Sequence, residues 1–258
     1  MNWIKVKNFE EMSREGAKRI FRTIANAAAD GKRVNIGLAT GNTMIRLYEL
    51  LAEELNRERI PLRNVHTYNL DEYAEKNGSA VPVTHPLSYR AYMTEHLFRR
   101  FDPALGFREE NIHFPDPTAP ERFDRELEEA GGTDLQLLGI GFNGHIAFNE
   151  PMEETEITAE EFGNLPSRLI RLKPLTIATN RRLTAGGKDL VPESAVTMGM
   201  KQILASKHLL LLACFPEQRN PLKEMRTKGR PTPALPASYL YTKSDSEILY
   251  CADTISLE

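Results

Sequence analysis

The stretch LQLLGIGFNGHIAFNEP, residues 135–151, is the part of this sequence that says most about its fold. Residues 135–140 form a short aliphatic run bounded by glycine, which favours a strand buried on both faces of a sheet over a helix. His145 and Glu150 follow in a glycine-punctuated loop just beyond the carboxyl end of that strand. In open α/β sheets ligands bind at this edge, because strand ends and helix amino termini converge there. Since an imidazole can exchange protons near neutral pH, we interpret residues 139–151 as an active-site loop.

Further apolar runs alternate with helical patterns along the chain. The predicted strands cover residues 33–38, 65–70, 135–140, 209–214 and 248–251. The predicted helices cover residues 9–30, 44–57, 88–101 and 120–130. Alternating strands and helices predict an α/β chain with a Rossmann-like three-layer αβα architecture, a mainly parallel sheet and right-handed crossovers. We expect one domain, residues 1–258, with no internal repeat.

Composition excludes several classes of protein. Lys and Arg number 33 against 36 Asp and Glu, a formal net charge of -3, which argues against a nucleic-acid partner. No segment approaches the roughly 20 apolar residues of a membrane span, and the start lacks a signal-peptide pattern, so we expect a cytoplasmic protein without a membrane partner. Cys214 and Cys251 lie in apolar surroundings that suit buried free thiols. Nothing in the spacing of the cysteines and histidines indicates a metal site.

Two other loops carry polar side chains at predicted strand ends. Residues 40–43, Thr-Gly-Asn-Thr, lie between a strand and a helix, where free amides and two hydroxyls could hold phosphate oxygens. A helix N-cap would also explain that loop. Asp71 and Glu72 follow the strand at residues 65–70, and neighbouring side chains on an extended backbone point to opposite faces. One carboxylate can therefore face a cleft while the other is held by structure or solvent.

Each candidate residue also has an ordinary explanation. His145 could be a satisfied core histidine, and Glu150 a helix-capping acid. Two solvated loop acids would account for Asp71 and Glu72. The long acidic segment 152–164 is nearly free of large apolar side chains, and we expect it to form a mobile excursion over the site, in the manner of a lid.

Taken together, these loops resemble the glucosamine-6-phosphate deaminase (isomerase) family. The matching segments occur in the family's order and are residues 37–43, 69–73, 85–89 and 141–151, with residues 195–199 as a weaker fifth match. The resemblance implies conversion of an amino-sugar 6-phosphate into a ketose 6-phosphate plus ammonia, without metal or organic cofactor. The expected partner is a hexosamine 6-phosphate, and whether the chain forms a homo-oligomer stays open.

The resemblance also implies roles for single residues. Asp71 would take the C2 proton and help deliver it to C1. His145 would open the pyranose ring, with Glu150 and Asn143 orienting its imidazole. Arg219 stands where many members of the family carry a phosphate-binding lysine, and Arg182 is aligned with a phosphate-binding position across a gap. The residues expected to contact substrate are Thr40, Gly41, Asn42, Thr43, Glu72, Gly144, Arg182 and Arg219.

Three alternatives remain at this stage. Galactosamine 6-phosphate differs from the glucosamine compound only at C4, which no residue visibly reads. A 6-phosphogluconolactonase shares the related scaffold, but it needs no proton shuttle at C2, so Asp71 and the segment 149–151 count against it. A phosphosugar-sensing module would normally carry a DNA-binding helix pair, for which the residues before the first predicted strand leave too little room.

Overall fold

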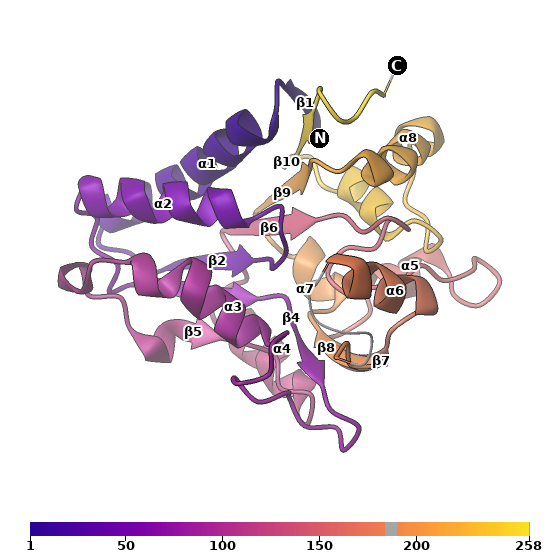
Figure 1. Cartoon of the computed structure of the whole chain (residues 1–258), viewed down its shortest axis with the longest axis horizontal. Helices are drawn as coiled ribbons and strands as arrows, with labels where there is room; N and C mark the ends of the chain where they lie inside the picture. Colours follow the sequence, from indigo (N-terminus) through magenta and orange to yellow (C-terminus); the bar gives the residue numbers. More distant parts are fainter. Residues whose placement is uncertain (184–189, 258) are drawn as a thin grey trace.

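A seven-stranded parallel sheet forms the centre of the computed structural model, which describes residues 1–183 and 190–257 (Figure 1). Among the described residues, all neighbouring strands of this sheet pair in parallel. The predicted α/β fold with a mainly parallel sheet is therefore confirmed. In spatial order the strands are β1 (Asn2–Val6), β10 (Ser246–Cys251), β9 (His208–Ala213), β6 (Leu135–Gly139), β2 (Val34–Leu38), β3 (Val65–Asn69) and β5 (Ile112–His113).

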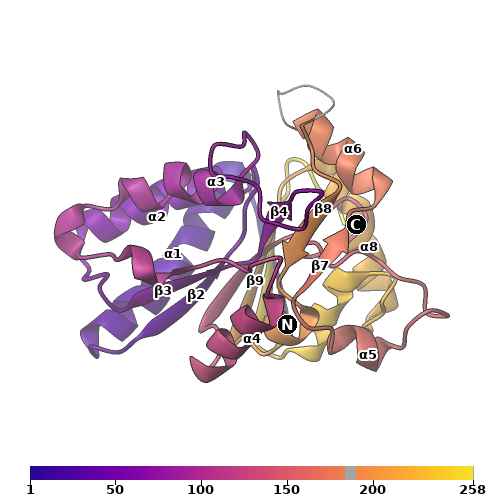
Figure 2. The same cartoon turned by 90° about the horizontal axis from the view of Figure 1, so that it is seen from below.

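Helices cover both faces of this sheet. Figure 2 shows α1 (Phe9–Ala29), α2 (Ile45–Arg57) and α3 (Tyr89–His96) on one side and α4 (Pro120–Glu129) on the other. Helix α1 illustrates why these segments fold as they do: Asn8 accepts a hydrogen bond from the Glu11 amide as N-cap, and one stripe of apolar side chains, including Met12, Ile20 and Ile24, is buried. The remaining helices are α5 (Ala159–Gly163), α6 (Pro174–Leu183), α7 (Met200–Leu204) and α8 (Arg219–Lys228).

A second, smaller sheet stands beside the carboxyl ends of the parallel strands. It is antiparallel and contains β4 (Asp71–Ala74), β8 (Ser194–Thr197) and β7 (Arg168–Arg171). Leu70 joins the two sheets, because its amide donates to the Leu38 carbonyl at 3.1 Å and its carbonyl accepts the Met198 amide at 2.6 Å. The chain therefore leaves the parallel sheet at Asn69 and enters the second sheet at Asp71.

The segment 152–164 differs from its prediction as an excursion over the site. Thr158 and Glu161 form a capping box that starts α5, and Phe162 on this helix is fully buried. The Phe162 ring packs on Tyr239 at 5.3 Å between centroids, and the Tyr239 hydroxyl donates to the Ala159 carbonyl at 2.7 Å. The burial of this one aromatic side chain anchors a segment whose acidic composition suggested mobility.

Cys214 and Cys251 are both free and buried, as the sequence predicts. Within residues 1–183 and 190–257, no helix is long and apolar enough to cross a membrane. The 3₁₀ turns are η1 (Phe98–Arg100), η2 (Pro103–Leu105), η3 (Glu109–Asn111), η4 (Pro216–Gln218) and η5 (Pro236–Thr242).

Candidate active site

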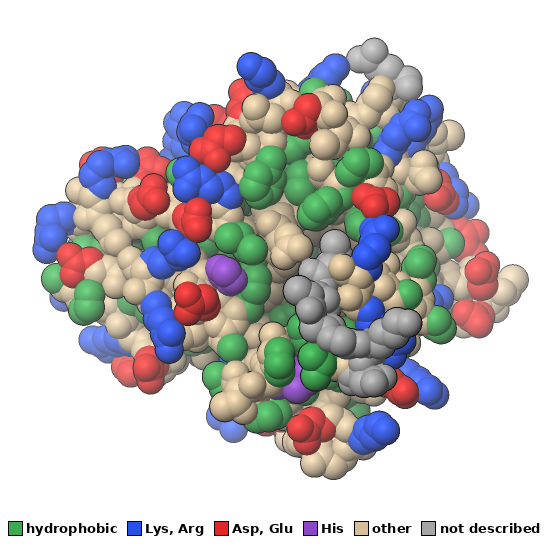
Figure 3. Space-filling view, viewed as in Figure 1, with side chains coloured by type: hydrophobic (Ala, Val, Ile, Leu, Met, Phe, Trp, Pro, Cys, Tyr) green, Lys and Arg blue, Asp and Glu red, His purple; other side chains and the backbone are tan. Residues whose placement is uncertain are grey.

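A cavity opens at the carboxyl ends of the parallel strands, where the loops after β2 and β6 diverge. β2 lies between β6 and β3 in the sheet. The chain continues from β2 to β3 on one side, whereas β6 lies on the other side, and this arrangement leaves a crevice at the carboxyl end of β2. Ligands usually bind in such a crevice in sheets of this kind. Figure 3 shows this face of the molecule hollowed near its middle. The cavity is lined by residues 39–44, 70–71, 139–143, Tyr89, His145, Ala147, Phe148, Leu175, Thr176, Thr179, Asn180, Phe215 and Gln218. Asp71, His145 and the loop 40–43 therefore share one cavity.

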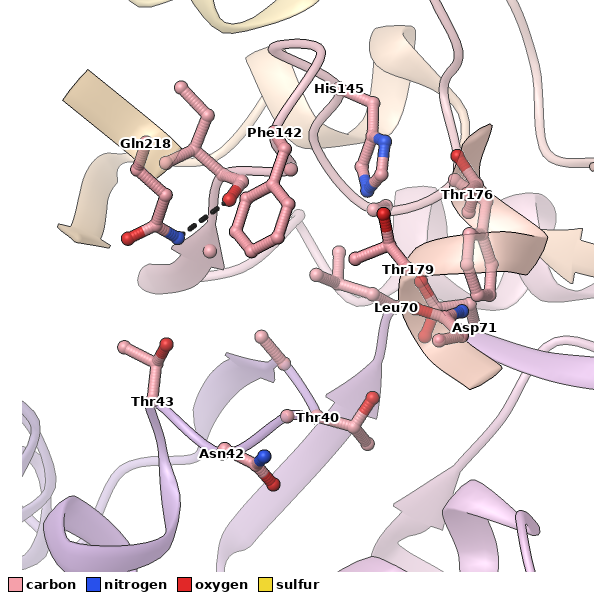
Figure 4. A pocket seen from close by; sticks show the side chains of 18 of the residues that line it. Thr40, Asn42, Thr43, Leu70, Asp71, Phe142, His145, Thr176, Thr179 and Gln218 are labelled. Atoms are coloured by element: carbon pink, nitrogen blue, oxygen red, sulfur yellow. Dashed lines mark hydrogen bonds between the residues drawn. The ribbon is translucent and has the colours of Figure 1, made fainter. Parts of the chain in front are cut away.

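The loop 40–43 presents its backbone to this cavity. Gly41 has a φ of +122°, a conformation that favours glycine. Helix α2 begins directly afterwards, and its N-cap, Met44, supplies no side-chain hydrogen bond to the first turn. The amide groups at the start of α2 therefore lack a capping side chain, and such a helix terminus attracts anions. Figure 4 shows Thr40, Asn42 and Thr43 across the cavity from His145 and Asp71.

Asp71 is a buried carboxylate that borders the cavity. Its side chain is only 6% exposed, and no group among the described residues donates a hydrogen bond to its carboxylate. Burial, with a smaller contribution from the neighbouring Glu72 carboxylate, raises the pKa of Asp71 well above its ordinary value. A carboxylate with a raised pKa and no partner is suited to take a proton from a bound molecule.

Glu72 points the other way, as alternation along β4 requires. It is fully buried and does not line the cavity. Its carboxylate accepts hydrogen bonds at the start of α3, from the amides of Tyr89 at 2.9 Å and Arg90 at 3.0 Å. The adjacent carboxylates therefore have different surroundings, and Glu72, which the sequence placed among the substrate contacts, is held by the protein itself.

The loop after β6 holds His145 in a fixed position. The amide of Gly141 donates to the His145 carbonyl at 2.9 Å, and the His145 amide donates to Asn143 Oδ1 at 3.2 Å. The imidazole lies against Gly141, where an added Cβ would come within 2.2 Å of His145 Cε1. Residue 141 therefore has to be glycine if the ring is to occupy this place.

Glu150 stands behind His145, outside the cavity lining. Its Oε2 lies 3.6 Å from His145 Nδ1 and accepts a hydrogen bond from Asn143 Nδ2 at 2.8 Å, while Oε1 accepts one from Thr176 Oγ1 at 2.5 Å. Burial would raise the pKa of Glu150, but the His145 imidazole and the donors Thr176 and Asn143 outweigh it and lower the pKa to about 2. A carboxylate therefore faces the rear of the imidazole, the arrangement that orients a catalytic histidine.

Besides Glu72, three more predicted substrate contacts lie outside the cavity lining. Arg182 is exposed; its guanidinium pairs with Glu217 at 2.8 Å and lies 5.6 Å from the centroid of the cavity residue Phe142. Arg219 is also exposed and donates to the Ser256 carbonyl at 2.9 Å, so it is directed away from the cavity. Gly144 turns the loop with a φ of +84° and leaves no space for a side chain beside Leu235.

Sequence reasoning missed several residues that line the cavity. Thr176, Thr179 and Asn180 come from α6, whose mixed polar and apolar pattern gave no helix prediction. Gln218 lies one position before Arg219 and is buried; its Nε2 donates to the Ile140 carbonyl at 2.7 Å, the dashed line in Figure 4. Nothing local in the sequence marks these side chains, because only the tertiary fold brings them to the strand ends.

The chain is similar to known proteins along its whole length. Residues 7–158 match the model of the family described as glucosamine-6-phosphate isomerases/6-phosphogluconolactonase. A glucosamine-6-phosphate deaminase of Thermoanaerobacter sp. (strain X514) is 34% identical over 100% of this chain and 95% of its own length, and one of Geobacillus sp. (strain WCH70) is 36% identical over 100% and 96%. The chain belongs to this glucosamine-6-phosphate isomerase/6-phosphogluconolactonase family.

Solved structures of family members share the fold. A monomeric glucosamine-6-phosphate deaminase superposes with a TM-score of 0.86 at 30% identity, with all of both chains covered. A 6-phosphogluconolactonase from Thermotoga maritima superposes with a TM-score of 0.66 at 24% identity, covering 97% of this chain and 98% of that one, a likeness that shows the fold alone. The expected membership of an enzyme family of amino-sugar metabolism is confirmed. Within the described part of the chain, no three His, Cys, Asp or Glu side chains are placed to share a metal ion.

Proposed function

We propose that this chain is a glucosamine-6-phosphate deaminase, which converts glucosamine 6-phosphate and water into fructose 6-phosphate and ammonia. The observation that carries the proposal is the shared cavity of Asp71, His145 and the loop 40–43. The full-length relatives named glucosamine-6-phosphate deaminase support the choice of substrate. In this proposal the loop binds the phosphate, and the two titratable side chains act at the other end of the sugar.

Phosphate binding would hold the substrate in one direction. The uncapped start of α2 and the hydroxyls of Thr40 and Thr43 offer donors to the phosphate oxygens. Because the phosphate is bonded to C6, gripping it leaves C1 and C2 on the side of Asp71 and His145 that Figure 4 shows. Such orientation turns the proton transfers into reactions within one complex.

His145 would open the ring before the transfer. Ring opening breaks the bond between C1 and the ring oxygen, removes the proton of the C1 hydroxyl and adds a proton to the ring oxygen. An imidazole can accept the proton from the hydroxyl and donate one to the ring oxygen. Glu150 and Asn143 would keep the imidazole in place while this happens, since Glu150 Oε2 lies 3.6 Å from His145 Nδ1 and Asn143 accepts the hydrogen bond of the His145 amide. The free aldehyde that results makes the C2 hydrogen acidic.

Asp71 would then act as the base at C2. Removing the C2 proton gives an enolamine, and returning a proton to C1 gives the ketose imine, so no electrons are gained or lost. Water adds to the imine carbon at C2, and ammonia leaves with the remaining proton. The raised pKa of Asp71 suits a group that must first take a proton and then give it back.

A direct assay tests this function. Purified protein is incubated with glucosamine 6-phosphate, and ammonia and fructose 6-phosphate are measured together. We expect the two products in equal amounts, and Asp71→Asn should abolish both. Parallel reactions with galactosamine 6-phosphate and 6-phosphogluconolactone test the two related activities. Absence of product from every hexosamine phosphate would overturn the proposal.

A further inference from the structure

Glu72 has an unusual number of partners for a carboxylate that does not touch the cavity. Its Oε1 accepts hydrogen bonds from the amides of Tyr73 and Tyr89, both at 2.9 Å. Its Oε2 accepts hydrogen bonds from the Arg90 amide at 3.0 Å and the Ser88 hydroxyl at 3.1 Å. Two of these donors belong to the first turn of α3. The residue after Asp71 in the chain therefore fixes the position at which α3 begins.

Helix α3 in turn contacts the loop 40–43. The hydroxyl of Tyr92, on the first turn of this helix, donates to the Gly41 carbonyl at 2.7 Å. Tyr89 starts the helix and lines the cavity between the loop and Asp71. A continuous set of bonds thus leads from the strand that carries Asp71, through Glu72 and α3, to the backbone of Gly41.

We propose that Glu72 is a positioning residue, which fixes the distance between Asp71 and the phosphate-binding loop through α3 and the Tyr92 to Gly41 hydrogen bond. This inference rests on the proposed function, because it assigns the loop to phosphate and Asp71 to C2. The sugar between these groups has a fixed length. A displacement of about 1 Å at either end can cost on the order of a hundredfold in rate, so a rigid connection between them has a clear use.

A purely structural role is the competing explanation. A buried carboxylate at a helix start stabilises the helix whether or not the helix serves the site. The two explanations differ in one respect: positioning requires that the effect of Glu72 on phosphosugar binding passes through Tyr92. A stabilising cap would instead lower the melting temperature without touching affinity.

A double-mutant cycle separates them. The variants are Glu72→Gln, Tyr92→Phe and the double variant. Glutamine keeps the shape of glutamate but places an NH₂ group where a carboxylate oxygen accepted a hydrogen bond from a backbone amide. Affinity for glucitol 6-phosphate, measured by calorimetry, gives a readout that does not depend on turnover, and kcat and KM for glucosamine 6-phosphate are measured beside it. Asp124→Asn is the matched control, because Asp124 is a buried carboxylate that accepts the Ser167 amide at 2.9 Å away from the cavity.

We expect each single variant to weaken glucitol 6-phosphate binding about tenfold, and Glu72→Gln to add less than about twofold once Tyr92 is phenylalanine. Asp124→Asn should leave the affinity for glucitol 6-phosphate unchanged, because Asp124 does not line the cavity. Independent, multiplying effects of the two substitutions would overturn the proposal, as would a Glu72→Gln variant that loses only stability. If Glu72→Gln does not fold, Tyr92→Phe decides alone: unchanged affinity contradicts the proposal. A wild-type protein that binds glucitol 6-phosphate without turnover would defeat the proposed function and leave this test intact.

Discussion

At the scale of single residues, the site depends on two carboxylates that stand in opposite electrostatic surroundings. Asp71 is buried, no hydrogen bond from the described residues reaches its carboxylate, and its pKa is raised. Glu150 is surrounded by donors, and its pKa is lowered to about 2. Titratable groups whose surroundings separate their pKa values are those that can divide acid and base roles. We assign the proton transfer to Asp71, because burial disfavours the charged form of this carboxylate.

Asp71→Asn should abolish turnover and stabilise the free protein at pH values well above the ordinary pKa of the carboxyl, 3.8. Because the pKa of Asp71 is raised on folding, the stability that its proton gives is complete below the ordinary pKa of 3.8 and is lost as pH rises through the raised value. Asparagine carries no charge at any pH and therefore avoids that loss. Thermal melts of both proteins between pH 5 and 9 should diverge as pH rises, and parallel curves would refute the assignment.

Glu150→Gln should change acid unfolding in the opposite sense. The lowered pKa of Glu150 gives stability that is present above its ordinary pKa of 4.5 and is lost as pH falls toward about 2. The whole shift corresponds to about 3 kcal/mol. The variant should be less stable at pH 7 and should show a flatter decline below pH 4.5. Stability curves measured in urea across this range provide the check, and an unchanged slope would count against the contacts described.

Gly141→Ala tests the placement of the imidazole. The new Cβ would lie 2.2 Å from His145 Cε1, so the imidazole must leave its present position. Since a misplaced acid or base forfeits about a hundredfold or more in rate, we expect kcat to fall by at least that factor while affinity for glucitol 6-phosphate stays within about threefold. Steady-state kinetics beside calorimetry would show it, and a fully active variant would mean that the ring lies elsewhere.

At the scale of the elements, the sequence predicts the central strands well because they are buried on both faces. The predicted strand at residues 65–70 corresponds to β3 at Val65–Asn69, and the one at 33–38 to β2 at Val34–Leu38. The second sheet was missed, since β4 and β7 are four-residue strands whose pairing partner, β8, lies far away in the chain. Edge strand β1 was missed for the same reason: it pairs with β10 at the other end of the chain.

The same distinction separates the site residues that the sequence predicts from those that it does not. Asp71, His145 and the loop 40–43 could be predicted because they directly follow strands that the apolar pattern reveals. Thr176 and Gln218 could not, because they reach the cavity through the packing of α6 and through η4, which the local pattern does not indicate. Arg219 shows the limit of alignment by motif, since the residue beside it is the one that lines the cavity.

Phe162→Ala tests whether the segment 152–164 serves stability or the site. Phe162 is fully buried against Tyr239, and none of the segment lines the cavity. Truncating a buried phenylalanine costs about 3 to 5 kcal/mol, so the melting temperature should fall markedly. At a temperature where the variant remains folded, kcat and KM should match those of the wild-type protein. A changed KM with unchanged stability would restore the lid hypothesis.

At the scale of the whole molecule, the order of the strands determines where the chemistry occurs. The loops after β2 and β6 border the crevice beside β2, and the connection from β3 to β4 brings Asp71 to the same crevice. Three segments far apart in sequence therefore meet at one edge of the sheet. We predict that the sugar lies across this edge with its phosphate at the start of α2.

A crystal structure of the protein with glucitol 6-phosphate is the most direct measurement of that claim. We predict phosphate oxygens within hydrogen-bonding distance of the amides of residues 41–43, with C1 and C2 of the hexitol beside the Asp71 carboxylate and the His145 imidazole. A ligand bound in the reverse direction, or a phosphate held away from the loop 40–43, would contradict the account.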